Sequence, residues 1–154
     1  MKSNVLFLVA LGLSILPGVS QDWAKARVEK SPRHLEWVDL KRSDRKLACY
    51  VGYPEVKEKA TAVLVIHEIF GASDWVRNVV DEFAEAGYIA IAPDLLSGSG
   101  PGGGGTKELG SSDTVTRTIR TLPPDQITGD LNAALEYVTK LPASNGKVAV
   151  AGFC

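Results

Sequence analysis

Hydrophobic side chains change their spacing several times along the chain, and each change marks a new element. Residues 35–40 alternate between the two faces of an extended segment, a polar turn follows at residues 42–45, and residues 46–53 continue as a second extended segment until Pro54. This pattern predicts an antiparallel hairpin. Residues 62–66 are apolar throughout, which is typical of a central strand covered on both faces.

The stretch after this strand has the spacing of a helix. Apolar residues recur every three or four positions between residues 75 and 83, after a polar start at Ser73, and Gly87 closes the helix. Residues 88–92 predict another strand. Because a helix joins two strands here, we expect a right-handed parallel crossover.

The later part of the chain predicts a loop, helices and a final strand. Residues 97–112 form a glycine-rich and serine-rich loop, and residues 131–141 form an amphipathic helix that a proline ends. Residues 114–122 are ambiguous, because their apolar spacing fits a helix whereas their threonines favour an extended chain. A turn at residues 144–146 leads to residues 148–151, which have the composition of a strand buried on both faces.

That last strand runs into Gly152-Phe153-Cys154. A nucleophile at a strand end sits on a tight turn that needs glycine, since a side chain there would collide with its neighbours. Cysteine suits the role because its thiolate is strongly nucleophilic. Taken alone, the motif also fits a buried cysteine at the end of a core strand.

Composition narrows the possible partners. The chain has 154 residues, 45% hydrophobic residues and a formal charge of −1, which fits one globular unit and gives no excess of positive charge for binding nucleic acid. Two cysteines are too few for a disulfide framework, and the two histidines have no metal-ligand spacing, so we expect neither a metal nor another cofactor. Cys49 lies inside the second hairpin strand and is interpreted as a packed core residue.

The first 20 residues have the pattern of a signal peptide. Lys2 precedes an apolar run at residues 5–16, and small residues at positions 18 and 20 fit a cleavage site. The run is too short to span a bilayer as a helix. We therefore expect export to the periplasm or the medium, a leader at residues 21–33 and one domain at residues 34–154. An uncleaved N-terminal anchor is the alternative.

Residues 98–103 match the glycine pattern of dinucleotide-binding proteins. That fingerprint must open a helix whose N-terminus holds pyrophosphate, whereas further glycines follow here. A surface loop is the preferred interpretation.

Three segments resemble the dienelactone hydrolase family. They are VIHEIFG at residues 65–71, APDL at residues 92–95, and SNGKV at residues 144–148 leading into GFC at residues 152–154. The resemblance covers nearly all of the chain after the signal peptide. It implies the N-terminal half of an α/β-hydrolase fold, which is a mostly parallel sheet flanked by helices with an antiparallel N-terminal hairpin.

The resemblance also implies roles for individual residues. Cys154 matches the nucleophile that forms an acyl-enzyme from an ester or lactone, and Glu68 matches the carboxylate that contacts the resting thiol and helps to generate its thiolate. The backbone N–H of Ile69 matches one donor of the oxyanion hole. His67 is interpreted as a packing residue, and Asp94 as a structural carboxylate in a turn.

The chain departs from the family pattern in two ways. Gly98 stands where the family has an arginine that holds the substrate carboxylate, so the resemblance does not extend to dienelactone as substrate. The triad aspartate and histidine are expected beyond Cys154, so we expect the chain to be an inactive fragment of a hydrolase that acts on a small ester or lactone. A non-catalytic binding protein of the same fold is the alternative, and the oligomeric state stays open.

Overall fold

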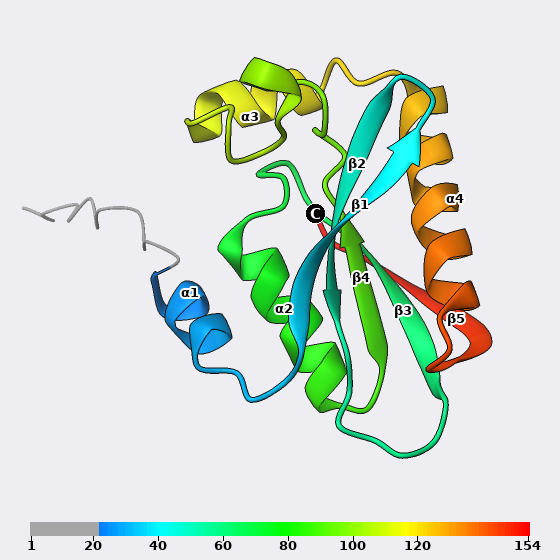
Figure 1. Ribbon diagram of the computed structural model, residues 1–154. Coiled ribbons are helices and arrows are strands. Elements are labelled where there is room, and N and C mark those ends of the chain that lie inside the picture. The colour runs from blue at the N-terminus through cyan, green and yellow to red at the C-terminus, as the bar shows by residue number, and fades with distance from the viewer. Residues whose placement is uncertain (1–21) are drawn as a thin grey trace, which may run out of the picture.

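Five strands form one mixed sheet in the computed structural model, which describes residues 22–154 (Figure 1). The strands are β1 (Leu35–Arg42), β2 (Arg45–Gly52), β3 (Ala60–Ile66), β4 (Ile89–Pro93) and β5 (Ser144–Gly152), in the spatial order β1-β2-β4-β3-β5. The β1–β2 and β2–β4 pairs are antiparallel, whereas β3 is parallel to both β4 and β5. The predicted α/β class with an antiparallel N-terminal hairpin is therefore confirmed.

The hairpin follows the predicted alternation. Leu47, Cys49 and Val51 are buried on one face of β2, while Tyr50 packs on the other face. Cys49 is fully buried, and this burial, with the carboxylates of the surrounding aspartates adding to it, raises the pKa of its thiol. The thiol therefore stays protonated, as expected of a packed core residue.

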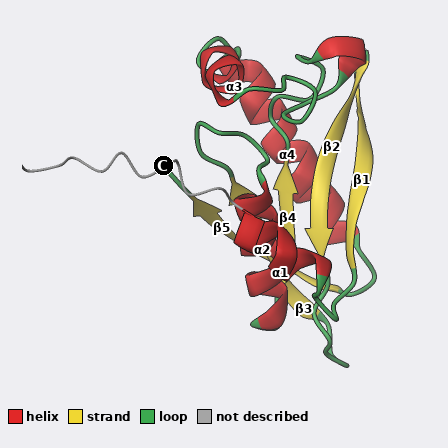
Figure 2. Cartoon of the chain, turned by 90° about the vertical axis from the view of Figure 1, so that its left-hand side faces the viewer, coloured by secondary structure: helices red, strands yellow, loops and turns green. Residues whose placement is uncertain are grey.

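Helices cover both faces of the sheet. Helices α1 (Asp22–Glu29) and α2 (Asp74–Glu85) lie on one face, in front of the sheet in Figure 2, and α4 (Pro124–Lys140) lies on the other. The predicted helix after β3 is confirmed as α2, whose residues Val76, Val79 and Val80 are buried in the core. It connects β3 to the adjacent parallel strand β4.

Helix α1 lies in the segment interpreted as a leader. Its buried contacts are limited to Ala24 and Val28, and Arg27 forms ion pairs with Glu82 and Glu85 of α2. With only two buried positions, the segment shows no helical spacing of apolar residues, and for this reason the helix was not predicted.

Several boundaries differ from the sequence prediction, and α4 begins at Pro124 where the helix was expected from residue 131. The ambiguous stretch forms helix α3 (Ser112–Ile119), where the Ser111 side chain caps the helix by accepting from the Thr114 N–H. A short 3₁₀ helix (Pro101–Gly103) interrupts the glycine-rich loop. Residues 144–146 belong to β5 and bulge out of its ladder, because Ser144 pairs with Ala60 and Val148 pairs with Ala62.

The expected burial of the last strand is wrong for the part of the chain that the structure describes. Strand β5 is at the edge of the sheet, and most of its residues are exposed, with Val150 at 60%. Within residues 22–154, β3 is the one strand that pairs with β5, and Val148 and Ala151 are only partly buried against the core.

Two buried carboxylates fasten helices to the rest of the fold. Asp81 of α2 is fully buried and accepts hydrogen bonds from Arg33 at 2.6 and 2.9 Å and from Ser31 at 2.6 Å. Burial opposes ionisation of Asp81, but these hydrogen bonds outweigh it and lower the pKa of the carboxyl. Asp130 of α4 is also fully buried and pairs with Arg45 and Arg42 at the tip of the hairpin.

The predicted signal peptide, residues 1–20, lies outside the described residues. Within residues 22–154, none of the helices combines the length and the hydropathy that crossing a bilayer requires.

Candidate active site

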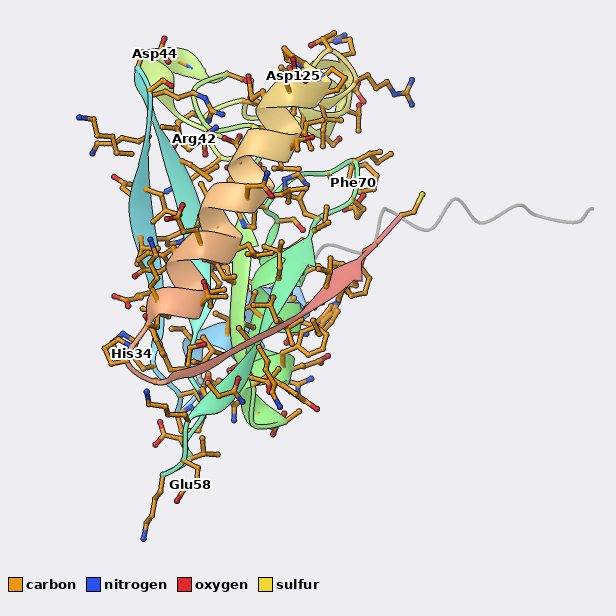
Figure 3. The ribbon with its side chains drawn as sticks, turned by 90° about the vertical axis from the view of Figure 1, so that its right-hand side faces the viewer. His34, Arg42, Asp44, Glu58, Phe70 and Asp125 are labelled. Atoms are coloured by element: carbon orange, nitrogen blue, oxygen red, sulfur yellow. The ribbon has the colours of Figure 1, made fainter. Side chains whose placement is uncertain are left out.

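The ends of β3 and β5 bring two of the predicted site residues to one edge of the sheet. Ile66 pairs with Gly152, and the Phe153 N–H donates to the Ile66 carbonyl at 3.1 Å. Glu68 and Cys154 are therefore each the second residue after this pair, on neighbouring parallel strands. Figure 3 shows Phe70 in the loop at the end of the sheet toward which β5 runs. The strand pairing thus brings Cys154 to the same edge of the sheet as the loop that contains Glu68 and Ile69.

An aromatic contact fixes the peptide just before the thiol. The Phe153 ring packs edge-on against Trp75 in the first turn of α2, with ring centroids 5.0 Å apart. Cys154 itself is exposed and its thiol is free. The strand end is therefore anchored, while the sulfur faces solvent.

Glu68 is half-buried, and its carboxylate is turned toward its own loop. One carboxylate oxygen accepts a hydrogen bond from the Phe70 N–H at 3.0 Å. This contact holds the carboxylate at the strand end that Cys154 also reaches. To accept a proton from the thiol, the carboxylate must come within hydrogen-bond reach of the sulfur.

The later part of the loop after β3 uses its backbone donors. Within residues 22–154, the Ile69 N–H has no hydrogen-bond acceptor, and neither does the Glu68 N–H just before it. The next four N–H groups are all satisfied: Phe70 donates to the Glu68 carboxylate, Gly71 to the Glu68 carbonyl, Ala72 to Thr106 Oγ1, and Ser73 to the Gly71 carbonyl. An N–H without an acceptor inside the protein is what an oxyanion donor requires.

His67 is buried, with 4% of its surface exposed, and both ring nitrogens have partners. Nε2 lies 3.1 Å from the Leu95 backbone nitrogen, and Nδ1 lies 2.9 Å from the Glu68 carbonyl oxygen. Because a backbone N–H can only donate, Nε2 is the acceptor and Nδ1 carries the proton. His67 is therefore a neutral, hydrogen-bonded residue of the interior and has no nitrogen free to act as a base.

Asp94 has the structural role expected of it. Its carboxylate accepts hydrogen bonds from the Leu96 N–H and from both the N–H and the hydroxyl of Thr106. The Thr106 hydroxyl oxygen in turn lies close to Gly71, where an added Cβ would approach it to 2.3 Å. Gly71 also has a φ of +72°, so the last residue of the VIHEIFG segment must be glycine for two reasons.

A hollow of about 890 Å³ has Asp94 and Thr106 in its lining. It is lined by Trp37 and Ala48 of the hairpin, Ser73 and Arg77 at the start of α2, and the glycine-rich loop at residues 101–108. Glu68, Ile69 and Cys154 are outside it. The candidate site is therefore assigned from the residues at the strand ends and not from the size of the hollow.

The glycine-rich loop lacks the geometry of a dinucleotide site. The next α-helix after residues 98–103 begins only at Ser112, so no helix N-terminus follows the glycines directly. Gly98 has a φ of +88°, and its N–H donates to the Gly104 carbonyl. Among residues 22–154, no group of three histidine, cysteine or acidic side chains is arranged to hold a metal ion.

Sequence reasoning did not find two parts of this arrangement. The bonds from His67 to Leu95 and from Thr106 to Asp94 link segments that are 28 and 12 residues apart. The position of His67 directly before Glu68 was the available signal, but a side chain that bonds through both nitrogens cannot be recognised from spacing alone.

Comparisons with known proteins agree on the family. The chain is 32% identical over 118 residues to carboxymethylenebutenolidase 1 of Cupriavidus pinatubonensis, covering 73% of this chain and 48% of the relative. It is 31% identical over 105 residues to the carboxymethylenebutenolidase of Pseudomonas putida, covering 68% and 44%. The chain thus spans about half the length of the curated relatives it matches.

A solved dienelactone hydrolase from Anabaena variabilis has the same fold, with a TM-score of 0.54 at 19% identity over 78% of this chain and 51% of that one. The model of the dienelactone hydrolase family matches residues 47–154, which include both the VIHEIFG loop and Cys154. Since this match extends over more than half of the sequence, the chain belongs to the dienelactone hydrolase family.

Proposed function

We propose that the protein is a hydrolase that cleaves ester or lactone bonds through a thiolate of Cys154 and an acyl-enzyme. The observation that carries the proposal is the pairing of β3 with β5. This pairing puts a free thiol and the unoccupied N–H of Ile69 at adjacent strand ends. Acyl transfer needs a nucleophile and an oxyanion donor on the same side of a pocket, and parallel neighbouring strands supply both.

The reaction divides into two steps. The Cys154 sulfur attacks the carbonyl carbon, and the electron pair of the C=O bond moves to the oxygen, which the Ile69 N–H stabilises. When the C=O bond forms again, the bond to the leaving oxygen breaks, and this oxygen takes up a proton. Water then adds to the thioester in the same way, releasing the acid and restoring the thiol. Glu68 is the residue proposed to accept the thiol proton in the first step.

The second step needs a base to activate water, and neither histidine of the chain is suited to it. His67 has both nitrogens bonded inside the protein. His34 lies at the opposite end of the sheet from Phe70 (Figure 3). We therefore propose that the base comes from residues outside this chain's 154.

Residues 21–154 on their own are expected to give no steady-state hydrolysis, because neither His34 nor His67 can supply the base that the second step needs. The measurement is the release of p-nitrophenol from p-nitrophenyl acetate by the purified 21–154 chain. The same chain with Cys154→Ala is the matched control. Turnover that depends on Cys154 would contradict the proposed inactivity.

The acyl-enzyme itself is the direct test of the proposed function. When the full-length protein is mixed briefly with p-nitrophenyl acetate and quenched in acid, its mass should increase by one acetyl group. Peptide mapping should place that group on Cys154, because the buried and protonated Cys49 thiol cannot compete.

A folded full-length protein that never gains the acetyl group would overturn the proposal and favour the non-catalytic binding protein instead. The substrate class rests on the family membership and on the relatives named carboxymethylenebutenolidase. Because residue 98 is glycine, no side chain stands at the family's carboxylate-binding position, so we propose a small ester or lactone in place of dienelactone.

A further inference from the structure

We propose that His67 is a positioning residue that aims the Ile69 N–H at the developing oxyanion. This inference rests on the proposed function and adds to it a residue that never touches the substrate. It follows from the partner of Nδ1, which is the carbonyl oxygen of Glu68 at 2.9 Å.

The Glu68 carbonyl and the Ile69 N–H are the two ends of one peptide unit. Because that unit is planar and trans, its C=O and N–H bonds point in opposite directions. A hydrogen bond that fixes the oxygen therefore also fixes the direction of the N–H. The same carbonyl accepts a second hydrogen bond from the Gly71 N–H at 3.2 Å, so two donors hold this oxygen from inside the protein.

The bond to the carbonyl also acts through the electrons of the amide. Hydrogen bonds to a peptide oxygen polarise the group, and the N–H at the other end becomes a better donor. Since the Ile69 N–H has no acceptor within residues 22–154, this donor is available to a ligand.

The other ring nitrogen makes the arrangement rigid. Nε2 accepts from the N–H of Leu95, a residue with 5% exposure in the turn after β4. The imidazole therefore spans from the loop after β3 to the turn after β4. Asp94 and Thr106 hold the same two segments together, because the Thr106 hydroxyl oxygen accepts from the Ala72 N–H while the hydroxyl donates to Asp94. The peptide is thus oriented by a buried framework, as a preorganised donor requires.

The test separates the oxyanion donor from the nucleophile in the full-length protein. The variants are His67→Leu, which has neither a donor nor an acceptor, and His67→Gln, which keeps one of each. For each protein we would measure the rate of Cys154 acetylation by p-nitrophenyl acetate and the rate of its alkylation by iodoacetamide. Alkylation displaces iodide from a saturated carbon and forms no oxyanion, so it reports on the thiol alone.

His67→Leu is expected to slow acetylation by about 10- to 100-fold, somewhat less than the loss of a whole oxyanion donor, while KM for the ester stays within about two-fold. Alkylation should be unchanged, and His67→Gln should recover most of the acetylation rate. If His67→Leu fails to fold, His67→Gln is compared with the parent. Because the glutamine side chain can hold the Glu68 carbonyl as the imidazole does, the ratio of the acetylation rate to the alkylation rate must stay near that of the parent.

His34→Leu is the matched control, since His34 is exposed and lies at the far end of the sheet. Both of its rates should equal those of the parent. Equal slowing of acetylation and alkylation in His67→Leu, an unchanged acetylation rate, or a lower ratio of the two in His67→Gln would overturn the inference. A parent that acquires no acetyl group on Cys154 would overturn the proposed function as well, so the two failures are distinguishable.

Discussion

Alanine in place of Cys154 in the full-length protein is expected to lower kcat/KM for a small activated ester by about 10³-fold or more. The exposed thiol at the end of β5 is the proposed nucleophile, and alanine leaves no atom there that can form the acyl bond. The oxyanion donor and the substrate contacts would remain, so some catalysis over the uncatalysed reaction in water should persist. Steady-state kinetics with p-nitrophenyl acetate would measure the loss.

Cys49→Ala is the matched control, because it removes the other cysteine of the chain from a buried position in β2. The strands β4 and β3 separate it from β5, and its thiol is kept protonated by burial. The kcat/KM of Cys49→Ala should equal that of the parent. If Cys154→Ala keeps most of the turnover, the cysteine mechanism is wrong.

Alanine in place of Asp130 is expected to lower the free energy of unfolding by about 3–5 kcal/mol. The fully buried carboxylate accepts from Arg45 at 2.6 Å through both oxygens and from Arg42 at 3.3 Å, which connects α4 to the tip of the β1–β2 hairpin. Without the carboxylate, two partly exposed guanidinium groups would lose the buried negative charge that they share. Urea unfolding followed by circular dichroism would measure the change.

Asp39→Ala removes the same chemical group from an exposed ion pair and is the control for this experiment. Asp39 pairs with Lys46 at 2.9 Å, but the two side chains are 52% and 77% exposed. The expected loss is about 0–1 kcal/mol, because solvent screens such pairs. Similar losses for Asp39→Ala and Asp130→Ala would show that burial of Asp130 does not determine its contribution.

Much of the sheet could be predicted from local patterns. The alternation in the hairpin and the apolar run of β3 each report directly on which faces are covered, so their positions needed no tertiary information. Helix α1 could not be found in this way, because ion pairs of Arg27 with α2 supply much of its contact. The exposure of β5 was also unpredictable, since burial depends on which segments pack beside a strand and not on its own composition.

The candidate site could also be predicted only in part from local patterns. The motifs placed Glu68 and Cys154 after two strands, and the register between Ile66 and Gly152 makes those strands neighbours. The resemblance named the Ile69 N–H as a donor, but the sequence did not show that the N–H groups after it are occupied, because Phe70, Gly71 and Ala72 find acceptors on three different groups. The same holds for His67, whose second partner, Leu95, follows a different strand.

The edge position of β5 connects two properties of the chain, its tendency to self-associate and the reactivity of the Cys154 thiol. A parallel edge with an exposed Val150 is a template on which a further strand can form a ladder, whether from the same chain or from another molecule. A strand added there that extends past Gly152 would lie beside Cys154 and shield the sulfur from reagents in solution. In preparations of residues 22–154, the aggregation propensity and the accessible thiol content should therefore change together.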